Sequence, residues 1–65
     1  MQILYNSKTD VLYLRLDDRK QHLINQRVDE DIVLDIGEDT MIVGIEILDA
    51  SKRLHLESLL PVTHG

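Results

Sequence analysis

The chain contains no cysteine, tryptophan or phenylalanine, and only one proline and three glycines. Without cysteine it cannot form disulfide bonds, thiolate zinc sites or a cysteine nucleophile, which excludes disulfide-stapled mini-proteins and zinc fingers. It also lacks an apolar run near the ~20 residues of a membrane-spanning helix. No basic segment precedes an apolar one in the manner of a signal peptide. We therefore expect a soluble, cytoplasmic protein with no membrane partner.

Basic residues are also scarce. Seven Lys and Arg stand against twelve Asp and Glu, which gives a formal net charge of −5. Affinity for nucleic acids depends largely on clustered basic residues, so we expect no nucleic-acid binding by this chain alone. A small domain buries only about 60% of its unfolded surface and often needs support beyond its own core. We therefore expect a homo-oligomer, a dimer or larger, and an acidic chain favours basic protein partners.

Apolar and polar residues alternate along most of the chain up to Asp49, which is the period of a β-strand. Polar clusters at 7–10 and 18–21, an acidic cluster at 29–31, and a Gly-Glu-Asp-Thr sequence at 37–40 interrupt this alternation. The segments between them predict five short strands, at about 2–6, 11–17, 22–28, 32–36 and 41–48. The short connections predict that these strands form an antiparallel β-meander.

The period changes at Asp49. Aspartate is a common N-cap residue, and proline a common stop, so the sequence predicts one helix from Ala50 to Leu60 and a tail over 61–65. We expect this helix to pack on one face of the sheet. The predicted fold is therefore α+β, with residues 1–65 forming a single small domain.

The two faces of the predicted sheet differ in composition. One face is expected to be an aliphatic layer of Leu4, Leu12, Leu14, Leu16, Ile24, Val28, Ile32, Leu34, Ile36, Val43, Ile45 and Ile47. The other also carries apolar residues, namely Ile3, Tyr5, Val11, Tyr13, Val33 and Ile42. If Tyr5 pairs with Val11, four of these residues form one patch: Ile3, Tyr5, Val11 and Tyr13. Such a patch indicates a self-association or partner surface, although exposed apolar residues are also ordinary in strands.

Acidic residues gather at the predicted turns. They are Asp17, Asp18, Asp29, Glu30, Asp31, Glu38 and Asp39. On the rim of a sheet, these charges can steer a basic protein toward the domain. They also serve solubility in many small proteins, and the sequence does not separate the two interpretations.

Asp35 and Glu46 project from the two best-defined strands, on the less apolar face. Paired carboxylates can act as general acid and base. No basic or aromatic residue that could build a pocket stands near them in sequence, so solvated surface acids are the simpler interpretation. The histidines, at 22, 55 and 64, lack the spacing of a metal site. We expect no catalytic residue, no metal and no cofactor, and therefore no enzyme.

Four segments carry a family resemblance: Tyr5, Asp10 with Leu12-Tyr13-Leu14-Arg15-Leu16, Val33-Leu34-Asp35, and Val43 to Ser51. From about Met1 to Leu54 the chain resembles the YuzE-like family of small uncharacterised prokaryotic proteins, a domain of unknown function. It departs from that family at two turns, where relatives often have glycine near Arg19 and Thr40.

The resemblance implies a compact sheet with one helix and no established activity. For some relatives it implies a proposed antitoxin role beside a small basic ribonuclease-like toxin. The polar residues of the matching segments, Asp35, Glu46 and Asp49, have no known role.

Two hypotheses follow for this protein. The first is a protein–protein interaction module, which the resemblance extends to an antitoxin-like neutraliser of a small basic partner. The alternative is a self-associating structural or regulatory β-protein without catalytic activity, joined by a two-fold contact.

Overall fold

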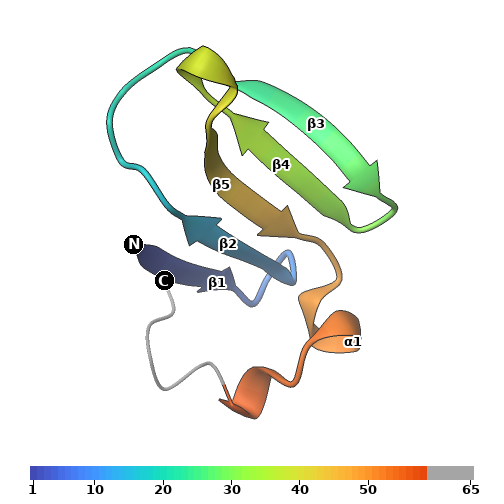
Figure 1. The fold of residues 1–65 in the computed structure, drawn as a ribbon. Coiled ribbons are helices and arrows are strands. Elements are labelled where there is room, and N and C mark those ends of the chain that lie inside the picture. Colours follow the sequence, from blue (N-terminus) through green and yellow to red (C-terminus); the bar gives the residue numbers. More distant parts are fainter. Residues whose placement is uncertain (59–65) are drawn as a thin grey trace.

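A computed structural model describes residues 1–58, in which five strands form one antiparallel sheet (Figure 1). The strands are β1 (Gln2–Asn6), β2 (Val11–Arg15), β3 (Ile24–Asp29), β4 (Ile32–Ile36) and β5 (Ile42–Ile47). Short helical segments follow β4 and β5: the 3₁₀ helices η1 (Glu38–Thr40) and η2 (Leu56–Ser58), and the α-helix α1 (Ala50–Arg53). The predicted α+β class, with a five-stranded antiparallel sheet and a helix, is confirmed at this level.

The predicted meander is wrong at one connection. The strand order is β1-β2-β5-β4-β3, so β5 lies between β2 and β4, and β3 forms an edge. Residues 16–23 lead from β2 to that edge. They lack an Asn-Gly or Asp-Gly sequence that would close a tight hairpin. At their start, the N–H groups of Leu16 and Asp17 donate to the carbonyl oxygen of Val43 at 2.9 and 3.2 Å, which ties this connection to β5.

Three strands differ from the predicted ranges at their ends. β2 ends at Arg15 and not at 17, β3 begins at Ile24 and not at 22, and β5 covers Ile42–Ile47 in place of 41–48. Beyond β2 the chain turns, because the Asp17 carboxylate accepts a hydrogen bond from the Arg19 N–H at 3.0 Å. The predicted tail at 61–65, the last two residues of the predicted helix and His64 lie outside the described residues.

The predicted helix from Ala50 to Leu60 is wrong in length. α1 ends at Arg53, because Leu54 is extended with φ −131° and ψ 151°. A helix this short gains little from cooperative propagation. Lys52 and Arg53 in its last turn interact favourably with the helix dipole, but its first turn has no acidic residue. α1 is too short to cover the sheet. No helix in residues 1–58 is long and apolar enough to span a membrane.

The first hairpin is shifted by one residue from the predicted register. Leu4 pairs with Tyr13 and Tyr5 with Leu12, so Tyr5 does not pair with Val11. The turn explains the shift, because the Asn6 side chain accepts hydrogen bonds from the N–H groups of Lys8 and Thr9 at 2.9 and 3.3 Å. These bonds close a loop over residues 7–10.

The shift divides the predicted patch between the two faces of the sheet. Paired residues lie on the same face of a sheet, and alternate residues of a strand do too. Ile3 and Tyr5 therefore lie with Leu12 on one face, whereas Val11 and Tyr13 lie on the opposite face. The prediction that Ile3, Tyr5, Val11 and Tyr13 lie on one face of the sheet is wrong.

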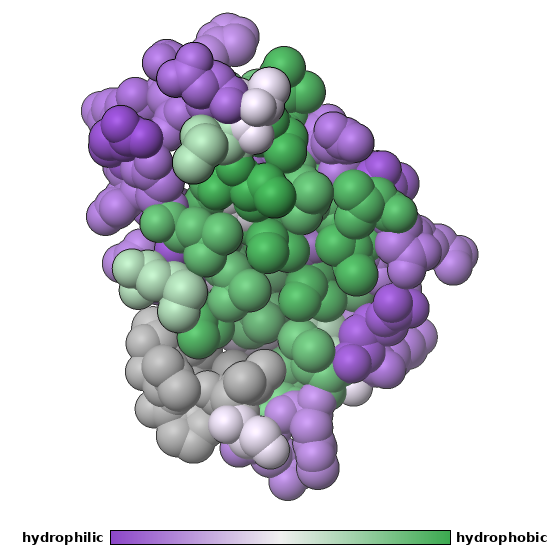
Figure 2. Space-filling view, viewed as in Figure 1, coloured by the Kyte–Doolittle hydropathy of each residue, from purple (hydrophilic) through white to green (hydrophobic). Residues whose placement is uncertain are grey.

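One face of the sheet is almost wholly aliphatic. We call it the apolar face; the pairings of β1, β2, β4 and β5 assign to it Ile3, Tyr5, Leu12, Leu14, Ile32, Leu34, Ile36, Ile45 and Ile47. Figure 2 shows this face as a continuous hydrophobic area with hydrophilic residues around it. Among the described hydrophobic residues, only Leu12, Val43 and Ala50 are buried. Most of the apolar face therefore stays partly accessible.

Candidate functional site

The opposite face, which we call the polar face, brings together side chains from four strands. Tyr13 of β2 pairs with Glu46 of β5, and Asp35 of β4 pairs with Gly44 of β5 and with Asn25 of β3. All of these positions lie on one side of the sheet because paired residues share a face. The structure thus brings Asp35 and Glu46 together on the face where the sequence placed them.

Asp35 is the most deeply placed charged residue in the described part of the chain. It is 4% exposed. The Asn25 side-chain amide donates a hydrogen bond to the Asp35 carboxylate at 2.5 Å. A buried carboxylate without such a partner would be strongly unfavourable. Within residues 1–58, every buried side-chain nitrogen and oxygen has a hydrogen-bond partner.

Gly44 creates the space in which Tyr13 reaches Asp35. A Cβ atom at position 44 would lie 2.3 Å from the Tyr13 hydroxyl oxygen, so a larger residue there would displace the ring. Burial raises the pKa of Tyr13, and hydrogen bonding to the Asp35 carboxylate raises it further. The Arg15 guanidinium lies 5.6 Å from the centre of the Tyr13 ring, in cation–π range.

Glu46 completes this cluster. Burial raises the pKa of Glu46, and the Asp35 carboxyl adds to the rise through a hydrogen bond and through its negative charge. Repulsion between two negative charges opposes ionisation of Glu46 beside the Asp35 carboxyl. Chemically, Glu46 can therefore hold a proton more tightly than an ordinary glutamate does. The low exposure of Asp35 limits direct contact with a substrate, so its clearest role is to hold β3, β4 and β5 together.

A second polar cluster was not predicted from the sequence. The Tyr5 hydroxyl donates to the Asp10 carboxylate at 2.7 Å, and the Ser51 hydroxyl donates to its other oxygen at 2.7 Å. The Ala50 N–H donates to the Asp10 backbone carbonyl at 2.9 Å. These bonds attach the first turn of α1 to the β1–β2 loop. The hydrogen bond from Ser51 and then that from Tyr5 lower the pKa of Asp10.

The predicted N-cap at Asp49 is therefore wrong. Asp49 has left-handed backbone angles, φ 51° and ψ 44°, and its side chain makes no capping hydrogen bond. Asp10 takes that role from a distant loop by accepting the Ser51 N–H at 3.1 Å. The only sequence signal for this contact was that Tyr5, Asp10 and Ser51 all fall in the segments of the family resemblance.

The acidic residues of the predicted rim have different environments. Arg19 pairs with Asp17 at 2.7 Å and lowers the pKa of Asp17 to about 2. Arg53 lies 3.3 Å from Asp29 and 3.6 Å from Asp31, which links α1 to the β3–β4 turn. The remaining rim residues, Asp18, Glu30, Glu38 and Asp39, are exposed. Part of the predicted rim thus stabilises the fold, and part of it faces solvent.

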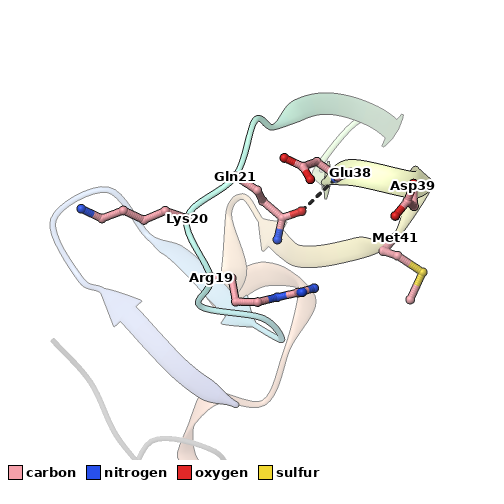
Figure 3. A pocket seen from close by; sticks show the side chains of 6 residues that line it. All are labelled: Arg19, Lys20, Gln21, Glu38, Asp39 and Met41. Atoms are coloured by element: carbon pink, nitrogen blue, oxygen red, sulfur yellow. Dashed lines mark hydrogen bonds between the residues drawn. The ribbon is translucent and has the colours of Figure 1, made fainter.

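A small hollow lies between the β2–β3 connection and η1 (Figure 3). It is lined by Arg19, Lys20, Gln21, Glu38, Asp39 and Met41. The Gln21 side-chain oxygen accepts a hydrogen bond from the Glu38 N–H at 2.8 Å. Gly37 allows this approach, since a Cβ there would lie 2.2 Å from the same Gln21 oxygen. In Figure 3 the Lys20 side chain points away from the other lining side chains. The hollow is therefore better described as a contact between two loops than as a ligand-binding pocket.

A second hollow retains part of the predicted patch. Its lining residues are Leu4, Tyr5, Asn6, Thr9, Val11 and Tyr13. At the edge strand β1, Tyr5 of the apolar face therefore lines one depression with Leu4, Val11 and Tyr13 of the opposite face, and Ile3 is not part of it. Residues 1–58 contain no group of three or more His, Cys, Asp or Glu side chains placed to hold a metal ion.

The sheet and its two polar clusters define a small α+β domain. The chain belongs to the family described as "Protein of unknown function (DUF2283)", whose sequence model matches residues 2–51. This is a family of uncharacterised proteins, as the sequence led us to expect. The matched region contains both the Asp10–Ser51 contact and the Asp35–Glu46 pair. No curated protein and no solved structure matches the chain.

Proposed function

We propose that this protein is a protein–protein interaction module whose working surface is the apolar face. The observation that carries the proposal is an aliphatic sheet face in a domain whose helix α1 has only one turn and is too short to cover it. Such a face is normally packed against another layer of structure. In residues 1–58 no second layer of comparable size is present.

The partial accessibility of the apolar face supports the same interpretation. Each Å² of apolar surface removed from water contributes about 25 cal/mol. Burial of this face against a partner would therefore supply the stabilisation that a small domain lacks.

The charge around the apolar face suggests the chemistry of the partner. The chain carries a net charge of −5, and Asp18, Glu30, Glu38 and Asp39 are exposed. Complementary potentials accelerate encounter and discourage wrong partners. The partner that fits is a small basic protein with an apolar centre. The family resemblance extends this proposal to an antitoxin-like role, in which the chain covers the working surface of a basic toxin.

Two adjacent substitutions test the proposal. Ile3→Asp places a charge on the apolar face, and Leu4→Asp makes the same type of change on the opposite face of the same strand. Both residues are half-buried, so circular dichroism first checks that the two variants fold equally. In a pull-down from the source cells, we expect the unmodified chain and Leu4→Asp to retain a basic protein that Ile3→Asp loses. Equal retention by both variants would contradict the proposal.

A second candidate is self-association through the same face. The residues that β2, β4 and β5 contribute to the apolar face include no charged side chain, so two copies can oppose this part of the sheet as a sandwich. This is the structural or regulatory alternative. Light scattering over a concentration series tests it, because Ile3→Asp would then lower the mass to that of a monomer and Leu4→Asp would not.

A further inference from the structure

The outer edge of β3 is open in the described part of the chain. β3 pairs with β4 alone, and Figure 1 shows no helix or loop along its other side. All residues of β3 are exposed, including Ile24 at 65% and Val28 at 50%. Edge strands are commonly protected by charges or proline. β3 contains no proline; its two charged residues are Arg27 and Asp29, and its register with β4 shifts between them. These protecting features lie at one end of the strand, and the edge from Ile24 to Gln26 has none.

The sequence of β3 is complementary to itself in one antiparallel register. If Gln26 lies on a two-fold axis, Ile24 of each copy lies opposite Val28 of the other. Asn25 then lies opposite Arg27, and no like charges are opposed. Directly opposite side chains on a sheet contact one another, and apolar pairs stabilise the contact. β3 pairs regularly with β4 from Ile24 to Arg27, so the axis falls within its regular part.

Neighbouring registers are less favourable. An axis midway between Gln26 and Arg27 places Ile24 opposite the charge of Asp29. An axis midway between Asn25 and Gln26 places Ile24 opposite the charge of Arg27. An axis at Arg27 places two guanidinium groups opposite each other. Like charges directly opposite on a sheet are destabilising. The register at Gln26 also keeps the acidic turns at 29–31 of the two copies at opposite ends of the contact.

We infer that two copies of this chain join edge to edge through β3, with Gln26 on the two-fold axis, and form one continuous antiparallel sheet. Such an isologous contact closes on itself and gives a dimer. An axis perpendicular to the sheet places both apolar faces on the same side. Those faces stay accessible to another protein, so this dimer does not depend on the proposed function.

Cysteine cross-linking tests the register directly, because the chain has no cysteine of its own. Opposed residues in antiparallel strands have Cα atoms about 4.5–5.5 Å apart, a range that a disulfide bond spans. Gln26→Cys should form a disulfide-linked dimer with oxidised glutathione, seen on a non-reducing gel. Gln2→Cys, on the exposed end of the opposite edge strand β1, controls for random collision and should not be cross-linked, so it should run as a monomer on the gel.

A double variant tests the contact without a cross-link. Ile24→Lys with Val28→Lys changes two exposed side chains, so circular dichroism should show an unchanged fold. By light scattering, we expect a dimer for the unmodified chain and for Ile3→Asp, and a monomer for the double variant at the same concentration. Equal cross-linking of the two cysteine variants, a monomeric unmodified chain, or a dimeric double variant would each overturn the inference. If Ile3→Asp loses a basic partner but remains a dimer, that result concerns the proposed function and not the β3 dimer.

Discussion

The carboxylate of Asp10 accepts hydrogen bonds from both the hydroxyl and the backbone N–H of Ser51, 41 positions further along the chain, at 2.7 and 3.1 Å. The first N–H groups of a helix have no partner inside the helix, and a nearby carboxylate can satisfy them. Here the capping group comes from the first loop of the protein. This contact joins the first loop of the matched family region to its last residue.

Removal of the Ser51 hydroxyl should weaken this attachment. We expect Ser51→Ala to lower Tm by a few degrees, because small domains respond strongly to the loss of one interaction. Thermal unfolding by circular dichroism measures the change. Ser58→Ala is the matched control, since Ser58 is also exposed and its bond to His55 uses the backbone N–H. Equal Tm values for the two variants would show that the contact is unimportant.

Acidification should destabilise the fold through Asp10 and Asp17. Both have a pKa below the ordinary value of 3.8, and that of Asp17 falls to about 2. A carboxyl group whose pKa is lower in the folded state than in the unfolded state stabilises the fold at pH values above its unfolded pKa. This stabilisation is lost as the pH falls through the folded-state pKa. We expect Tm to fall between pH 4 and about pH 2. In Asp17→Asn this fall should be smaller, and an unchanged profile would contradict the assignment.

Glu46 should have the opposite effect. Its pKa is raised above the ordinary value of 4.5 by burial and by Asp35. The folded state therefore binds its proton more tightly, and stability is lost as the pH rises above 4.5 toward the folded pKa. We expect Glu46→Gln to raise Tm at neutral pH, with little effect below pH 4. Glu30→Gln, at an exposed position, is the control, and an NMR titration of Glu46 with a midpoint at or below 4.5 would contradict the prediction.

Gly44→Ala should displace the Tyr13 ring from Asp35. The added Cβ would lie 2.3 Å from the Tyr13 hydroxyl oxygen, and overpacking of this type typically destabilises by about 1–3 kcal/mol. Urea unfolding of Gly44→Ala, Tyr13→Ala and the double variant forms a double-mutant cycle. We expect the double variant to be more stable than the sum of the single changes predicts. Strict additivity would mean that the two residues do not interact.

Local patterns along the sequence determined a large part of this fold. Alternation of apolar and polar residues predicted the five strands and the α+β class, because the period of side chains along a strand is a local property. The same alternation placed Asp35 and Glu46 on one face. The absence of cysteine excluded disulfides and thiolate metal sites without any structure.

Tertiary contacts decided the rest. The register at Tyr5 depended on the Asn6 side chain in the turn. A one-residue slip exchanged the faces of β1 and divided the predicted patch between the two faces of the sheet. The position of β5 between β2 and β4, and the capping of α1 by Asp10, both join residues far apart in sequence. Residue periodicity carries no information about such contacts, because their free energy depends on which segments meet once the chain has folded.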